Sequence, residues 1–448
     1  MTNTTPADAG IGLDPHLAFA RRADRSDGLA HFRKQFYGTD GPLVYFDGNS
    51  LGRPTIASIE RIQRFLTAGW GDRLIRGWDE EWMQLPLTIG DSLGRVALGA
   101  SAGQTFVGDS TTVLLYKLAR AAVDASLRER APVPELAEGR PSASSGTDAG
   151  GRIEIVLDTD NFPTDRYVLT GIAAETGMTL RWIESDTAAG VTAEQVAAAV
   201  GPQTALVVLS HVAYRSGFLA DAAEITRITH DAGALILWDL CHSVGSVPVE
   251  LDTWGADLAV GCTYKYLNGG PGSPAFGFVR AELQESLTQP IHGWLGNEDA
   301  FAMGPEYLPA TGIRRFISGT PSLIGMLAMQ DTLAMIGDRG IDAVRAKSVA
   351  LTEFAITLAD EWLAPLGATL ASPREAARRG GHVTVNHPAM RKVNAMLWQQ
   401  DVLPDYRDPG GLRIGLSPLS TSFEETYRGM AAVRDTLRDV LLRQSGLA

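Results

Sequence analysis

Short apolar runs separated by helical patterns fill the middle of this 448-residue chain and limit what it can fold into. The runs are rich in Val, Ile and Leu and end at polar or small residues, which is typical of fully buried strands. The predicted strands span residues 153–157, 180–183, 205–209, 234–238, 258–262 and 275–279, with helical patterns such as 192–200 and 220–232 between them. This alternation indicates βαβ units, so we predict an α/β fold with a largely parallel sheet flanked by helices.

The two ends of the chain differ from the middle. A polar N-terminal tail precedes a predicted helix over residues 15–36, and further helices are predicted over 57–70, over 113–127 and from Pro321 onward. Residues 340–448 combine helices with strand candidates at 382–386 and 412–416, which indicates a small α+β domain. We therefore predict an N-terminal segment (1–45) that packs with the small domain, a large domain (46–325) and a small C-terminal domain (326–448).

Composition narrows the class of protein. The formal net charge of −13 argues against nucleic acid or an anionic membrane as a partner. No apolar run reaches about 18 residues, and residues 1–12 lack the apolar core of a signal peptide, so we predict a cytoplasmic protein. Cys241 and Cys262, the two cysteines, fall in buried strand regions, and we expect them to pack as small apolar side chains. Residues 131–152 are rich in Pro, Ser, Gly and Ala, which indicates a flexible surface insertion.

An aspartate and a lysine follow two neighbouring predicted strands. Asp239 comes directly after the strand 234–238, and Lys265 follows the strand 258–262 within the segment TYKYLNGG. Open α/β sheets present their ligand groups at the carboxyl ends of the strands. Lys265 is one of five lysines, and the other four, at positions 34, 117, 347 and 392, stand in amphipathic or loop-like polar contexts.

This pair of residues suits one cofactor chemistry. A lysine that forms an imine needs a strand-end position, partial desolvation and close approach of the backbone to the cofactor. An acid 26 residues upstream suits the protonated pyridine nitrogen of pyridoxal phosphate, which makes that ring an electron sink. The alternative is an aspartate that caps a helix and a lysine at the surface, and the spacing alone does not separate the two.

Five segments, in order along the chain, resemble the kynureninases, a family within the type I fold of pyridoxal-phosphate enzymes. TYKYLNGGPGSPAF resembles the family's lysine segment, and WDLCHSVG resembles its cofactor-aspartate segment. Three more stretches agree: YFDGNSLG at 45–52, NFPTDRY at 161–167 and HGWLG at 292–296. The resemblance spans residues 43–423. It implies a mainly parallel sheet of about seven strands, pyridoxal 5′-phosphate as cofactor, no metal, and a homodimer with a shared active site.

The resemblance also implies which residues form the site. It assigns catalysis to Lys265, Asp239 and Tyr264, and leaves open whether Tyr264 relays protons or holds the phosphate. Cofactor-binding residues on the same basis are Thr111, Thr112, Phe162, Thr164, Asp165, Ser210, Asp239, His242, Tyr264, Lys265, Trp294 and Thr320. Substrate-binding residues are Asn49, Ser50, Trp78, Gly319 and Arg413. The turn at 47–50 suits a connection between domains, a substrate contact, or both.

At three of these positions, the residue could instead have a purely structural role. A lone tryptophan such as Trp78 is more often core than ligand. Hydroxyl residues before the helix at 113–127 are N-caps by default, although the free N–H groups there, near Thr111, also suit a phosphate. Arg413 lies in an apolar strand, where it needs either an acid such as Asp405 or Asp408, or a substrate α-carboxylate held by its two-pronged guanidinium.

The implied activity is hydrolysis of L-kynurenine to anthranilate and L-alanine by cleavage of the Cβ–Cγ bond, in tryptophan degradation. L-Kynurenine should be preferred to its 3-hydroxy derivative, because relatives specialised for the latter carry Asn where Gly319 stands and His in the loop that holds Trp78. Two alternatives are another type I pyridoxal-phosphate enzyme, a cysteine desulfurase or an aminotransferase, and a non-catalytic homologue. Neither cysteine falls in a mobile loop, as a desulfurase requires, and the intact pair of Lys265 and Asp239 argues against a non-catalytic protein.

Overall fold

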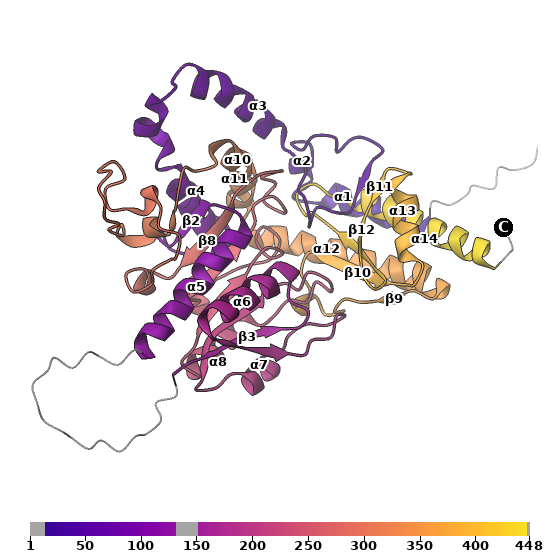
Figure 1. Ribbon diagram of the computed structural model, residues 1–448. Helices are drawn as coiled ribbons and strands as arrows, with labels where there is room; N and C mark the ends of the chain where they lie inside the picture. Colours follow the sequence, from indigo (N-terminus) through magenta and orange to yellow (C-terminus); the bar gives the residue numbers. More distant parts are fainter. Residues whose placement is uncertain (1–13, 131–150, 446–448) are drawn as a thin grey trace, which may run out of the picture.

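A seven-stranded sheet runs through the larger part of the molecule in the order β2-β8-β7-β6-β5-β3-β4 (Figure 1). The computed structural model describes residues 14–130 and 151–445, so most of the predicted insertion lies outside the described residues. Within this sheet β8 is antiparallel to both of its neighbours, and the other strands run parallel to one another. The strands are β2 (Thr105–Gly108), β3 (Glu154–Asp158), β4 (Thr179–Ile183), β5 (Thr204–Ser210), β6 (Leu235–Asp239), β7 (Leu258–Gly261) and β8 (Ala275–Val279).

The six predicted strands of this sheet are all present, and their ends differ from the predicted ends by at most one residue. The seventh strand, β2, was not predicted. It pairs on one side only, with Thr105 opposite Phe278 of β8. A four-residue strand at the edge of a sheet is too short to show either a long apolar run or an alternating pattern.

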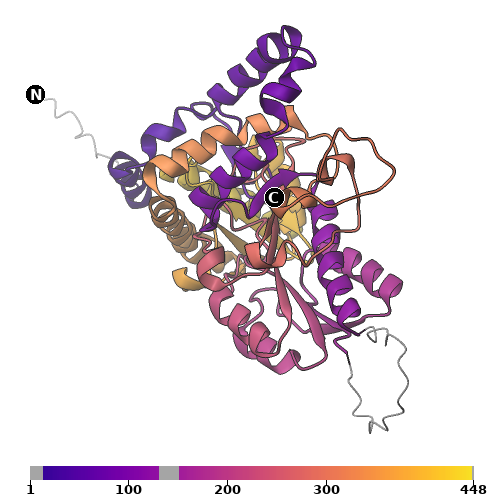
Figure 2. The same cartoon turned by 90° about the vertical axis from the view of Figure 1, so that its left-hand side faces the viewer.

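Helices cover both faces of the sheet (Figures 1 and 2). Ile155 and Leu157 of β3 point into the core under α5 and α6, whereas Val156 points into the core on the opposite face, which α4, α7, α8 and α11 cover. Successive side chains of a strand alternate between faces, so a strand that is covered on both sides is apolar throughout. No helix in the described ranges is both long enough and apolar enough to span a membrane. The covering helices are α4 (Leu85–Leu93), α5 (Thr111–Arg130), α6 (Pro163–Thr176), α7 (Ala193–Ala199), α8 (Ala222–Asp231) and α11 (Met329–Arg339).

A second, four-stranded antiparallel sheet lies beside the first, in the order β12-β13-β10-β9 (Figure 1). Both predicted strands of the C-terminal region are present, and one of them, β10, has the predicted ends. The domain boundaries at 45/46 and 325/326 stay a prediction. The elements here are β9 (Thr369–Leu370), β10 (His382–Asn386), β12 (Asp405–Arg407), β13 (Gly411–Gly415), α12 (Ile341–Leu358), α13 (Met390–Trp398) and α14 (Phe423–Gln444).

Two of the predicted helices are interrupted. The helix predicted over 15–36 is wrong as a single element, because α1 (Pro15–Ser26) ends before Asp27 and a separate turn, α2 (Ala30–Arg33), follows. The carboxylate of Asp27 lies 2.6 Å from Nζ of Lys347, a buried partner far away in sequence. The helical stretch after Pro321 divides into α10 (Leu323–Leu327), α11 and α12, and Gly340 separates the last two with a φ of 80°.

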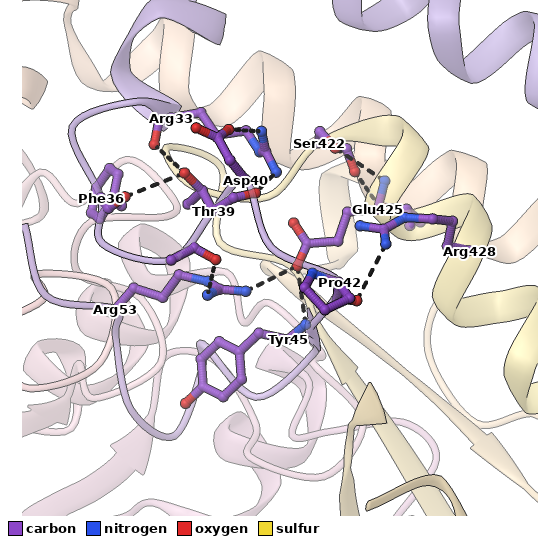
Figure 3. A network of polar contacts seen from close by, with 12 residues as sticks. Arg33, Phe36, Thr39, Asp40, Pro42, Tyr45, Arg53, Ser422, Glu425 and Arg428 are labelled. Atoms are coloured by element: carbon purple, nitrogen blue, oxygen red, sulfur yellow. Dashed lines mark hydrogen bonds and ion pairs between the residues drawn. The ribbon is translucent and has the colours of Figure 1, made fainter. Parts of the chain in front are cut away.

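Glu425 of α14 joins the N-terminal segment to the C-terminal part of the molecule (Figure 3). Its Oε1 atom accepts hydrogen bonds from the backbone N–H of Tyr45, at 3.0 Å, and from Nη2 of Arg53, at 3.1 Å. Tyr45 belongs to β1 (Val44–Tyr45), which pairs in parallel with β11 (Val402–Leu403). Because Tyr45 and Arg53 flank the 47–50 turn on both sides, Glu425 fixes both ends of that turn.

Candidate active site

The carboxyl ends of β3, β5, β6 and β7 bring the central predicted residues together. Ser210 ends β5 and Asp239 ends β6, and the two are register partners in the parallel pair. Lys265 lies four residues after β7, and Phe162 stands before the first turn of α6, after β3. Asp239 is 4% exposed and Lys265 is 7% exposed, so both charged groups lie inside the protein, as ligand groups at strand ends do.

The amino group of Lys265 lies among an imidazole and two aromatic rings. Its Nζ atom is 3.1 Å from Nε2 of His242, 6.0 Å from the ring centre of Phe162 and 5.9 Å from that of Tyr264. Burial and the charge of Lys265 hold the pKa of His242 well below its usual range. A neutral imidazole has a lone pair to offer, so His242 can accept a hydrogen bond from the lysine.

Asp239 is fixed by its own loop and by its neighbour on β5. Its Oδ1 atom accepts a hydrogen bond of 2.8 Å from the backbone N–H of Cys241, and its Oδ2 atom lies 3.3 Å from the hydroxyl of Ser210. The same hydroxyl lies 3.0 Å from Oδ1 of Asn161, a residue to which the sequence analysis gave no role of its own. These contacts hold the carboxylate at the end of β6.

Asp165, in the first turn of α6, is a second buried carboxyl group at this edge of the sheet. It is 2% exposed, and its Oδ2 atom has no hydrogen-bond partner among the described residues. Burial, and then the nearby charge of Asp239, raise the pKa of Asp165 well above its usual value. A buried polar atom without a partner is costly, so Asp165 marks a place where a polar group from a ligand would be stabilising.

A pocket of about 510 Å³ opens beside these residues, at the N-terminus of α5. One wall carries Asp109, Ser110, Thr111 and Thr112, and another is the segment from Ile317 to Ser322; Tyr264 lines the pocket as well. Hydroxyl groups and the free N–H groups of a helix N-terminus form an anion site. Thr111, Thr112, Tyr264, Gly319 and Thr320 therefore meet at one pocket, whereas Thr164 lies at the start of α6.

Trp78 and Trp294 each pack against another aromatic ring. Trp78 lines a separate apolar pocket of about 480 Å³, together with Trp70 and Ile75, and this pocket shares the segment from Thr320 to Ser322 with the first one. Its ring packs edge-on against Trp82, with 5.3 Å between the ring centres. Trp294 packs against Phe301, and the backbone of its neighbour Leu295 donates to the carbonyl of Ser318.

Arg413, on β13, is almost completely buried and already has partners. Its Nη2 atom donates to the hydroxyl of Ser50 and lies 2.6 Å from Oδ2 of Asp405, and its Nη1 atom donates to the carbonyl of Tyr214. Asp405 pairs with it across the sheet, so one of the two acids named from the sequence supplies the ion pair. The side-chain amide of Asn49, next to Ser50, is buried without any hydrogen-bond partner among the described residues.

Four lysines other than Lys265 were predicted to lie in amphipathic or loop-like polar contexts. This prediction is wrong for two of them, which are buried. Lys117 is 0% exposed and Lys347 is 6% exposed. Each pairs with an aspartate, Lys117 with Asp109 and Lys347 with Asp27. Each lysine lies on the covered side of its helix, where a buried charge needs a partner.

Comparison with solved structures defines the class of the molecule. A cysteine desulfurase from Thermococcus onnurineus superposes with a TM-score of 0.74 at 18% identity, over 91% of this chain and 98% of the other. A C-DES variant that carries glycine covalently linked to its pyridoxal-phosphate cofactor superposes with a TM-score of 0.73 at 19% identity, over 90% of this chain and 99% of the other. The fold is that of the type I pyridoxal-phosphate enzymes.

Relatives in sequence define the family. The kynureninase of Pseudomonas fluorescens is 38% identical over 417 residues, which cover 92% of this chain and 94% of that protein. The kynureninase of Burkholderia pseudomallei is 38% identical over 421 residues, which cover 93% of this chain and 94% of that protein. Residues 344–433 match the model of the kynureninase C-terminal domain. The chain belongs to the kynureninase family.

The likeness to cysteine desulfurases extends to the fold alone. Cys241 and Cys262 are both buried, as predicted, and neither forms a disulfide. The sulfur of Cys262 contacts the carbonyl of Cys241 at 3.6 Å, and the two residues lie just beyond the carboxyl ends of β7 and β6. A thiol that accepts sulfur from a substrate has to reach it from an accessible position, which neither cysteine has.

Proposed function

We propose that this chain is a pyridoxal-phosphate-dependent kynureninase that hydrolyses L-kynurenine to anthranilate and L-alanine. One observation carries the proposal: in a chain of the kynureninase family, Lys265 lies buried at the end of a central strand, within reach of Phe162 and His242 and on the same sheet edge as Asp239. A lysine there has the placement of the amine that bonds covalently to the aldehyde of the cofactor.

The residues of the site suit pyridoxal phosphate in three respects. Asp239 offers a buried carboxylate to a pyridinium nitrogen, and the unpartnered Oδ2 atom of Asp165 lies on the same sheet edge. The ring of Phe162 lies close enough to Lys265 to stack on an aromatic ring attached there. Thr111 and Tyr264 line a pocket at a helix N-terminus, which suits a phosphate.

When bound, the cofactor supplies an electron sink for the charge that develops on the substrate during bond cleavage. The chain itself supplies proton transfer and orientation. Lys265, at Nζ, would carry a proton to and from the substrate, and neutral His242 would accept a hydrogen bond from that atom and orient it. Asp239, held by Cys241 and Ser210, would keep its charge beside the ring nitrogen.

Arg413 would hold the α-carboxylate of the substrate. Its guanidinium is buried and planar, and it faces the Ser50 side of the 47–50 turn. Since Asp405 and Ser50 occupy Nη2, a substrate carboxylate would have to replace at least one of these contacts. The pocket beside Trp78 and the segment at Gly319 would then receive the aromatic end of the substrate.

We further propose that the working form is a homodimer. Large apolar side chains are exposed on the segment that follows α3 (Ile56–Arg64), with Trp70 54% and Ile75 75% exposed. Apolar clusters of this kind mark surfaces that another protein covers. The pocket lined by Trp78 adjoins this exposed apolar segment. A second copy bound there would lie next to the candidate active site.

The test is to incubate the purified protein with L-kynurenine and pyridoxal phosphate and to follow anthranilate by its fluorescence. Wild-type protein should produce anthranilate and L-alanine in equal amounts. Lys265→Ala should lose essentially all turnover, because the attachment point and the proton carrier are the same atom, while Lys392→Ala, at an exposed lysine, should behave as wild type. Near-normal turnover by Lys265→Ala would contradict the assignment, and a wild-type protein without either product would contradict the function.

A further inference from the structure

The ammonium group of Lys117 is buried behind the pocket at the N-terminus of α5. The residue is 0% exposed, and burial lowers the pKa of Lys117 while the pair with Asp109 opposes that shift. A charge removed from water is retained in a fold when several oxygen atoms replace its hydration. Lys117 has three such oxygen atoms: those of Asp109 and Ser318 belong to the two walls of the pocket, and that of Phe316 belongs to the residue just before the second wall.

These three contacts tie the two walls together. Nζ of Lys117 lies 3.0 Å from Oδ2 of Asp109 and donates to the hydroxyl of Ser318 at 2.8 Å and to the carbonyl of Phe316. Asp109 is the residue just before Ser110, and its φ of 49° places it in the left-handed region. The turn that presents the N-terminus of α5 is therefore fixed to the segment that leads into Gly319.

The charges have a consequence for the pocket. The side chain of Asp109 is 32% exposed and lines the pocket, so it brings a negative charge to a place that suits an anion. Like charges a few ångströms apart repel strongly where the effective dielectric constant is about 20. Lys117, directly behind this carboxylate, supplies the compensating positive charge from the protein interior.

We infer that Lys117 is a positioning residue for the cofactor phosphate, which keeps Asp109 neutralised and folded back so that the hydroxyl and N–H groups of the pocket face the anion. The inference rests on the proposed function, because it takes the ligand of this pocket to be the phosphate of pyridoxal phosphate. It concerns the affinity for the phosphate group, and it assigns Lys117 no part in bond cleavage.

The test compares the affinity of the full-length apoprotein for pyridoxal phosphate and for pyridoxal, which lacks the phosphate, by absorbance titration. Lys117→Met leaves Asp109 uncompensated and should weaken pyridoxal-phosphate binding by about tenfold or more, with a much smaller effect on pyridoxal. Asp109→Asn, which tolerates the left-handed backbone, leaves Lys117 as a net positive charge and should keep or raise the affinity for pyridoxal phosphate. The double variant Lys117→Met with Asp109→Asn should return to within about threefold of wild type.

Opposite effects of the two single variants separate this role from support of the fold. If both weaken the two ligands equally, or if Lys117→Met binds pyridoxal phosphate as wild type does, the inference is wrong. Should Lys117→Met fail to fold, Asp109→Asn decides alone, because a fall in its preference for pyridoxal phosphate over pyridoxal overturns the inference. A wild-type protein that binds neither ligand would instead refute the proposed cofactor.

Discussion

Asp158 shows how a buried group that touches no ligand can control the pH dependence of this protein. It ends β3 and is 6% exposed, and burial raises its pKa to about 7 from the usual 3.8. Its Oδ1 atom accepts a hydrogen bond from the backbone N–H of Asp160 at 3.0 Å, which only partly offsets the loss of hydration. Between these two pKa values the folded chain retains a proton that the unfolded chain releases.

The sign of the effect follows from this difference. The contribution of Asp158 to stability should be complete below about pH 4 and should be lost as the pH rises to about 7, on the order of 4 kcal/mol in all. Asp158→Asn cannot ionise, so the free energy of unfolding should fall less over this range than in wild type. Asp338→Asn, at an exposed carboxylate, is the control and should keep the wild-type slope. Denaturant unfolding between pH 4 and pH 8 measures both, and an unchanged slope in Asp158→Asn would show that the group is ionised in the fold.

Arg413 allows its two interpretations to be separated. If it holds the substrate carboxylate, Arg413→Ala should raise KM by the equivalent of about 2–5 kcal/mol, and cofactor binding should stay the same. Arg413→Lys should restore little, because an ammonium lacks the planar pair of donors. Steady-state kinetics and a cofactor titration on the same preparations measure both quantities. An unchanged KM together with lower thermal stability would leave the ion pair with Asp405 as the whole role of Arg413.

Gly319 should set the preference between L-kynurenine and its 3-hydroxy derivative. A Cβ atom at this position would meet no atom within 4 Å, and the backbone there is not left-handed, so Gly319→Asn should fold normally. Wild type should favour L-kynurenine by about 10- to 100-fold in kcat/KM, because a buried hydroxyl without a partner is costly. Gly319→Asn should reduce that ratio, and Gly304→Asn, at an equally open glycine, should not. Equal kcat/KM values for both substrates in wild type would contradict this role.

At the scale of single residues, sequence patterns point to polar residues that follow buried strands. They do not reveal a buried residue whose contacts lie far away in the sequence. Lys265 and Asp239 stand out in the sequence because each comes shortly after a buried apolar run. The burial of Lys117 depends on Ser318 and Phe316, about 200 positions away, and no local pattern reveals such a contact. The ion pair between Arg413 and Asp405 was one of the two predicted alternatives, because an arginine in an apolar strand needs an acid nearby.

At the scale of elements, one buried carboxylate on α14 contacts both flanks of the 47–50 turn. Glu425 is 2% exposed, and one of its oxygen atoms accepts hydrogen bonds from Tyr45 and Arg53 (Figure 3). Its second oxygen atom has no hydrogen-bond partner among the described residues. Glu425→Ala would leave Arg53 buried without its counter-charge. Because the turn carries Ser50, which contacts Arg413, the effect should extend to the substrate site.

Glu425→Ala should therefore lower the free energy of unfolding by about 3–5 kcal/mol and raise KM. The next residue offers a matched control: Glu424 pairs with Arg21 at 3.3 Å on the surface, and Glu424→Ala should cost less than about 1 kcal/mol. Thermal unfolding of the three proteins, with kinetics on the same samples, makes the comparison. Equal losses in the two variants would show that the buried pair contributes no more than a surface pair.

Patterns of apolar residues suffice to predict some of the strands but not others. Central strands are buried on both faces and bounded by turns, so their ends could be predicted to within one residue. The edge strand β2 and the two-residue pair of β1 and β11 are too short for a pattern. The break at Asp27 was missed although its signal is local, because Asp27 stands before Gly28 and its side chain accepts a hydrogen bond from the backbone N–H of Leu29 at 2.8 Å.

For the whole molecule, the open question is what covers the apolar segment that follows α3. Figures 1 and 2 show α3 and this segment extending from the body of the molecule. Leu74 and Ile75 are 58% and 75% exposed there, and Trp70 is 54% exposed. An exposed cluster of this kind is typical of a surface that another protein covers, and Trp70, Leu74 and Ile75 line the pocket of Trp78, where the proposed second copy would bind.

Ile75→Asp should consequently weaken the proposed dimer. A carboxylate placed in an apolar interface loses its hydration without gaining a partner, so the dissociation constant should rise by at least about tenfold. Leu442→Asp, at an exposed leucine near the end of α14, is the matched control and should stay dimeric. Sedimentation equilibrium gives the molecular mass, and anthranilate production per chain shows whether dissociation also removes activity. A monomeric wild type, or an Ile75→Asp variant that remains fully dimeric, would remove this surface from the interface. A dissociated variant with full activity per chain would show that each chain holds a complete site of its own.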